Sequence, residues 1–160
     1  MRSSMRSWHK SVAASGLVLL ALTAVACTTG GTAAPTTGAT SPTVSEAWVR
    51  PPQGMDRPAA GYMIITGGSS ADALLSVSTT AAGMVEIHET TVDASGMAGM
   101  HPIPRLDVPA GGRVELRPGG YHLMLMQVVE GAIEVGKTVE LRLTFEKAGE
   151  IVVQAEVLAG

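Results

Sequence analysis

The chain has 160 residues, with 11 Lys or Arg, 14 Asp or Glu and a formal net charge of −3. It contains a single cysteine, Cys27, which excludes an intramolecular disulfide and a cysteine-based metal site. Nucleic-acid binding typically needs clustered positive charge and stacking aromatic side chains. An acidic chain that is only 3% aromatic excludes that class of function.

The first 27 residues have the three zones of a lipoprotein export signal: a basic start, an apolar run over residues 12–26, and small residues before Cys27. The run is shorter than the roughly 20 apolar residues that a transmembrane helix needs. Segment 22–27 resembles a bacterial lipobox, in which the cysteine is lipidated on sulfur and becomes the mature N-terminus. We therefore expect an extracytoplasmic protein, periplasmic or on the outer face of the cell membrane, held to that membrane by a lipid.

Residues 28–45 are almost all Thr, Ala, Gly, Pro and Ser. Such a stretch cannot bury enough apolar surface to order itself, so we predict a flexible tether. The remaining segment, 46–158, has the size of one domain with one hydrophobic core.

Within 46–158 the apolar residues recur in short runs between Gly- and Pro-rich turns, which is typical of an all-β domain. The clearest strand is 138–145, where Val139, Leu141, Leu143 and Phe145 share one face. Short strands at this spacing indicate a Greek-key antiparallel β-sandwich. We predict nine strands, at 46–50, 59–66, 73–78, 83–91, 97–102, 113–116, 122–129, 138–145 and 150–158.

Histidine and methionine gather between residues 88 and 126. A single methionine is usually a core residue that fills gaps. In the strand that begins at His122, however, alternation puts His122, Met124 and Met126 on one face and two leucines on the other. The leucines are the natural core face. The His/Met face would then point to solvent or a cleft, where packing does not explain methionine.

These residue types favour copper as the metal. Cu(I) prefers thioether and thiolate sulfur and accepts imidazole, whereas Zn(II) sites use Cys, His and carboxylates. A thioether also suits an oxidising compartment, because it cannot form a disulfide. A blue-copper electron carrier is excluded because it requires a cysteine ligand. No Ser-His-Asp or His-Glu-x-x-His spacing occurs, so we predict no enzyme.

The pattern resembles the periplasmic Cu(I) chaperones called PCuAC, which carry a histidine, a distant methionine and a closing His-x-Met. His88 is followed by eleven residues and Met100, then by twenty-one residues and His122-Leu-Met124. The surrounding segments are also similar over nearly the whole domain: 46–50, 60–63, 85–89, 97–100, 109–112 and 116–126.

The resemblance implies a cupredoxin-like sandwich in which His88, Met100, His122 and Met124 bind one Cu(I) at an exposed rim. Met97 and His101 lie near enough in sequence to be spare or transfer ligands, although Met97 could equally fill the core. Met126 would lie about 7 Å along the strand from Met124 and so just outside the ligand set.

The resemblance also implies partners. The family passes copper to the binuclear copper centre of cytochrome c oxidase, in its subunit II, often alongside a thioredoxin-like copper chaperone. Two alternatives stay open: an extracytoplasmic copper buffering or resistance protein that does not supply the oxidase, and a structural β-sandwich whose methionines only pack.

Overall fold

The computed structural model describes residues 40–54 and 57–160. The predicted export signal, Cys27 and most of the predicted tether lie outside the described residues. No helix in the described part is long and apolar enough to cross a membrane.

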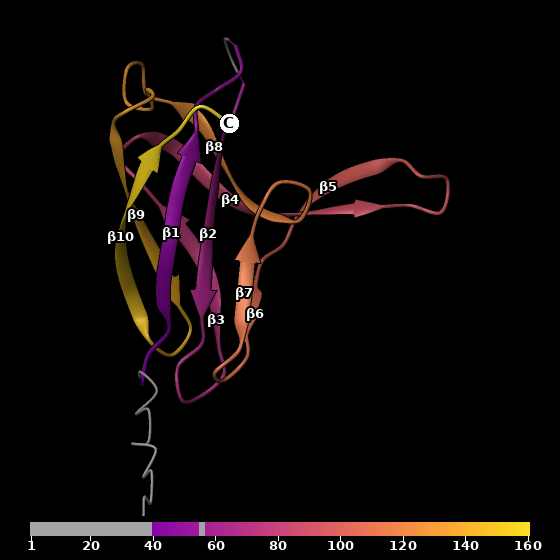
Figure 1. Ribbon diagram of the computed structural model, residues 1–160, viewed down its shortest axis with the longest axis vertical. Helices are drawn as coiled ribbons and strands as arrows, with labels where there is room; N and C mark the ends of the chain where they lie inside the picture. Colours follow the sequence, from indigo (N-terminus) through magenta and orange to yellow (C-terminus); the bar gives the residue numbers. More distant parts are fainter. Residues whose placement is uncertain (1–39, 55–56) are drawn as a thin grey trace, which may run out of the picture. The chain divides into compact units, whose positions relative to one another are not determined.

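The described residues form ten strands (Figure 1). The first begins at Thr43, three residues before the predicted domain boundary at 46. The strands are β1 (Thr43–Arg50), β2 (Ala59–Thr66), β3 (Asp72–Ser78), β4 (Ala82–Val92), β5 (Ala98–Pro102), β6 (Leu106–Val108), β7 (Arg113–Leu116), β8 (Tyr121–Val128), β9 (Thr138–Phe145) and β10 (Gly149–Val157).

The prediction of nine strands was wrong by one, because β6 was missed. This strand has only three residues, Leu106, Asp107 and Val108, and lies between two prolines at 104 and 109. Three residues are too few for alternation to be recognised in the sequence. The strand exists because it pairs antiparallel with β3.

The strands form one continuous sheet in the order β5-β4-β8-β7-β2-β1-β10-β9-β3-β6, with β8 also pairing with β2. Most neighbours are antiparallel, as predicted, but β1 runs parallel to β10 and β7 runs parallel to β8. Buried residues from both halves of the sheet, such as Leu74 of β3 and Leu123 of β8, belong to a single core cluster. The predicted all-β fold is confirmed.

The core confirms the alternation read from the sequence. Val139, Leu141, Leu143 and Phe145 of β9 are all buried. On β8 the two leucines, Leu123 and Leu125, are fully buried in the core cluster. The described core residues all lie between 49 and 157, so segment 40–160 contains what it needs to fold by itself.

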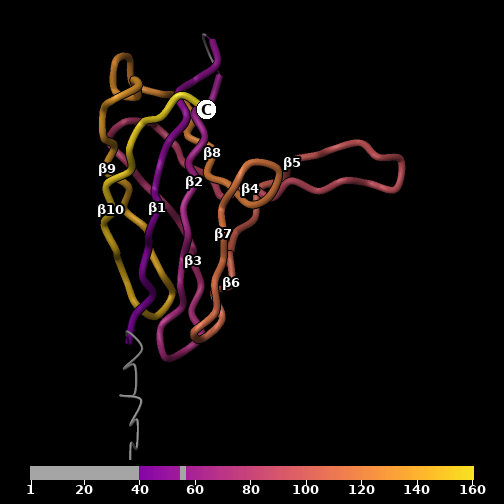
Figure 2. The backbone as a smooth tube through the Cα atoms, in the orientation of Figure 1, coloured from indigo at the N-terminus to yellow at the C-terminus, as the bar shows by residue number. Residues whose placement is uncertain are grey.

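Two features of the sheet position the site. β2 comes very close to β8 at Gly61, where an added Cβ would lie 3.2 Å from the Cβ of Leu123. This close approach fixes β8 against the core. On its other side β8 pairs with β4, and the hairpin of β4 and β5 extends away from the sheet as an arm (Figures 1 and 2).

Candidate metal site

Two histidines meet across the β4–β8 pairing. His88 of β4 lies directly opposite His122 of β8, so both side chains point to the same face of the sheet. The centroids of the two imidazole rings are 5.8 Å apart and the ring planes are inclined by 46°. The core residues Ile87 and Leu123, the next pair along the ladder, face the other way.

The His122 ring is oriented by a turn. Its Nδ1 lies 3.0 Å from the carbonyl oxygen of Gly120, and because a carbonyl only accepts hydrogen bonds, Nδ1 must carry the proton. In a neutral ring Nε2 is then the atom with a free lone pair. The turn depends on Gly119, whose φ of +78° is a conformation that glycine adopts readily.

The His88 ring is oriented by a carboxylate. Its Nε2 lies 2.8 Å from Oε2 of Glu86, two residues earlier on β4. The carboxylate accepts, so Nε2 donates and Nδ1 of the neutral ring keeps the lone pair. This Nδ1 is buried and has no hydrogen-bond partner among the described residues. A buried acceptor without a partner is costly, and a metal ion would satisfy it.

Methionines lie on either side of the histidine pair. Met124 of β8 is opposite Glu86 of β4, and Met100 of β5 is opposite Thr90 of β4. In both cases the paired residue lies two positions from His88, so all these side chains share its face. The structure therefore brings His88, Met100, His122 and Met124 to one face of three adjacent strands.

The expected exposure of this face was wrong for the histidines. His88 is 7% exposed and His122 is 6% exposed, whereas Met100 is 57% exposed. The two rings lie side by side across the β4–β8 pairing, with their centroids 5.8 Å apart. His88 is also flanked by Pro102 in the β4–β5 ladder.

Met97 and His101 lie elsewhere. Met97 follows the turn at the tip of the β4–β5 hairpin and is 68% exposed. Its backbone N–H donates to Oδ1 of Asp93, and the tip is about 13 Å along β4 from His88. His101 is on the opposite face of the hairpin from Met100, and its Nε2 is 2.7 Å from Oγ1 of Thr91.

Met126 has a neighbour that the sequence reasoning missed. It shares the face of Met124 and lies opposite Met84 of β4. Met84 is 44% exposed and, with Met124 and Met126, lines a groove of about 1190 Å³. Met84 lies four residues before His88 on the same strand, so the two share a face. The alternation of side chains along the predicted strand 83–91 could therefore have identified Met84 from the sequence.

Carboxylates do not offer a rival metal site. Within residues 40–54 and 57–160, no three His, Cys, Asp or Glu side chains are grouped so that they could hold a metal ion. A metal on the face of the two histidines would therefore need methionine sulfur as well as imidazole nitrogen. This donor set favours a soft ion over Zn(II).

Comparison with known proteins points to lipoproteins. A family model described as "Putative lipoprotein LpqE-like" matches residues 42–157. The "Putative lipoprotein Lxx21020" of Leifsonia xyli subsp. xyli is 30% identical over 102 residues, which are 64% of this chain and 60% of that protein. The match thus spans less than two thirds of that relative's length.

Two solved structures with a similar fold contain copper. The copper-bound PCuAC domain of PmoF2 superposes with a TM-score of 0.62 at 28% identity, covering 74% of this chain and 93% of that domain. The Cu(I) form of DR1885 from Deinococcus radiodurans has a TM-score of 0.56 at 30% identity, covering 82% and 84%. The resemblance to PCuAC domains drawn from the sequence is confirmed, and with it the predicted cupredoxin-like fold.

Proposed function

The chain belongs to the LpqE-like lipoprotein family, and we propose that it is an extracytoplasmic, lipid-anchored chaperone for Cu(I). Two solved relatives were determined with copper bound, one of them explicitly as Cu(I). The match to lipoproteins supports membrane anchoring, which in our proposal occurs through Cys27.

One observation carries the proposal. Two buried imidazoles face each other across β4 and β8, and in each ring the second nitrogen is engaged elsewhere. We assign His88 Nδ1, His122 Nε2 and the sulfurs of Met100 and Met124 as ligands of one Cu(I). The orphaned Nδ1 of His88 supports this assignment, because an imidazole that served only packing would have no reason to bury an unpaired acceptor.

The ligand set suits delivery as well as binding. The four proposed ligands are neutral, so they do not balance the single positive charge of Cu(I). The carboxylate of Glu86, which contacts Nε2 of His88, supplies a negative charge close to the site. The buried histidines would retain the ion. Met100, on the exposed side of the hairpin, would be the first ligand that an acceptor's sulfur could replace. Transfer is then a sequence of ligand exchanges in which copper remains Cu(I).

We further propose that the acceptor is the binuclear copper centre in subunit II of cytochrome c oxidase, with a thioredoxin-like copper chaperone acting alongside. This step rests on the resemblance to PCuAC. A copper buffer that uses the same site is the second candidate. Deletion of the gene separates the two: loss of copper from the oxidase supports delivery, whereas copper sensitivity with a fully loaded oxidase contradicts it.

An anaerobic competition titration tests the binding itself. Segment 40–160 is titrated with Cu(I) against a chromogenic Cu(I) chelator, alongside His122→Ala and Met124→Leu. Met97→Leu is the matched control, because it removes an exposed thioether at the hairpin tip. We expect one tight equivalent in the wild type and in the control, and a large loss of affinity in the other two. If the wild type does not compete with the chelator for Cu(I), the chaperone proposal is wrong and the domain is a structural β-sandwich whose methionines only pack.

A further inference from the structure

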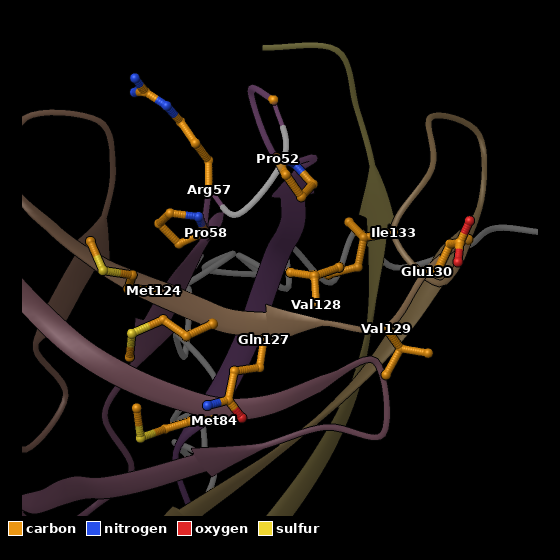
Figure 3. Close-up of a pocket in the computed structure, with 13 residues that line it drawn as sticks. Pro52, Arg57, Pro58, Met84, Met124, Gln127, Val128, Val129, Glu130 and Ile133 are labelled. Carbon is orange, nitrogen blue, oxygen red and sulfur yellow. The ribbon is translucent and has the colours of Figure 1, made fainter.

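A groove beside the histidine pair has an end rich in sulfur. Met84 of β4 and Met124 of β8 lie at this end, while Val129, Glu130 and Ile133 line the other end (Figure 3). Met126 of β8, the cross-strand partner of Met84, also lines the groove. The loop between β1 and β2 contributes Pro52 and Pro58. The groove therefore continues from one of the four assigned ligands, Met124, to two methionines outside the assigned set.

The strand register allows the three sulfurs to converge. Met84 is directly opposite Met126, and such cross-strand partners have Cβ atoms about 4.5–5.5 Å apart. Met124 is the next residue on the same face of β8, about 7 Å away along the strand. A methionine side chain has three rotatable bonds, so three thioethers at these positions can reach a common point.

Core packing does not explain these methionines. The core faces of β4 and β8 carry Ile87, Leu123 and Leu125, and the methionines lie on the opposite face. Met84 is 44% exposed and Met126 is half-buried. Arg57, the cation among the groove residues, points away from Met84 and Met124 in Figure 3.

We propose that Met84 and Met126, together with Met124, form a second site for Cu(I), through which the ion enters or leaves the histidine site. Three neutral thioethers favour a soft monovalent ion over hard or borderline cations. Met124 belongs to both sites, so copper passes between them when Met84 and Met126 replace His88, His122 and Met100 as its ligands while the bond to Met124 is kept. No electron is gained or lost. This inference rests on the proposed function of the histidine site.

The test follows the methionine methyl groups by NMR in segment 40–160 labelled with ¹³C at the methionine methyls. Cu(I) is diamagnetic, so the methyl resonances stay sharp when it binds. The wild type is compared with Met84→Leu/Met126→Leu and with Met97→Leu, the control that removes an exposed thioether outside the groove. The rate of Cu(I) transfer to a chromogenic chelator is measured on the same samples.

The first equivalent should shift Met100 and Met124. Further Cu(I), held by Met84 and Met126 while Met124 serves the first ion, should shift these two methyls, with Met97 and the buried Met63 unchanged. In the double variant the first equivalent should remain, the later shifts should disappear, and transfer to the chelator should slow. The control should behave as the wild type. Resonances of Met84 and Met126 that stay fixed in excess Cu(I), while Met100 and Met124 respond, would overturn the second site and leave the proposed function intact. Shifts at Met84 and Met126 without any at Met100 would instead overturn the histidine site.

Discussion

Glu86 determines which nitrogen of His88 can serve as a ligand. Its Oε2 accepts from Nε2 at 2.8 Å, which leaves the buried Nδ1 as the acceptor on the face of Met100 and Met124. Groups that orient metal-binding histidines in this way also make the ligand more basic. The carboxylate is therefore expected to matter for copper without touching it.

Replacing Glu86 should weaken copper binding. We expect Glu86→Ala to lower Cu(I) affinity by about 10–100-fold, the usual effect of removing a group that orients a metal ligand. Glu89→Ala is the matched control, because Glu89 lies on the same strand but on the opposite face. Chelator competition measures the Cu(I) affinity of both variants. Equal affinities would contradict the orienting role of Glu86, because they would mean that the lost negative charge alone lowers the affinity or that neither carboxylate affects it.

At the scale of elements, Asp72 ties the start of β3 to the turn after β9. Its carboxylate accepts from the backbone N–H groups of Ala73, Lys147 and Ala148 at 2.7–2.9 Å, and the residue is only 5% exposed. Burial alone would raise the pKa of Asp72, but the three backbone donors outweigh it and the pKa is lowered. The charged form is thus the one that the fold stabilises.

Asp72→Asn should lower the free energy of unfolding at pH 7 by about 1.5–3 kcal/mol, because the amide cannot accept all three bonds of a charged group. A carboxyl whose pKa is lower in the folded protein than in the unfolded chain stabilises the fold at pH values above the unfolded pKa, which is near 3.9. This stabilisation is lost as the pH falls through the folded pKa. Denaturant unfolding should therefore show a smaller gap between wild type and variant at pH 3 than at pH 7. Exposed Asp107→Asn is the control, expected to change stability by less than about 0.5 kcal/mol. A gap that does not depend on pH would contradict the account.

The strands and the face that carries the two histidines and the methionines were largely predictable, because both depend on the two-residue repeat of β structure. The alternation of His122, Met124 and Met126 gave the face, and that of β9 gave the core. Register between strands is set by tertiary packing and could not be derived from the sequence. The opposition of Met84 to Met126, the burial of the histidines and the short strand β6 all depend on it.

At the scale of the whole molecule, the proposal requires that the protein be held at a membrane through Cys27. Cys27→Ser removes the sulfur that would carry the lipid. We expect the variant to move from the membrane fraction to the soluble fraction in cell fractionation. The full chain of either form should bind Cu(I) equally. A serine variant that stays with the membrane would show that another feature anchors the chain.

The parallel pairing of β1 with β10 has a consequence for the order of events during biogenesis. The first strand of the sheet lies between β2 and β10, so its hydrogen bonding is complete only when residues near 157 are present. Contacts of such long sequence separation are slow to form. The sheet therefore cannot close while its last strand is still being synthesised, and the chain stays without its complete fold until synthesis has passed residue 157.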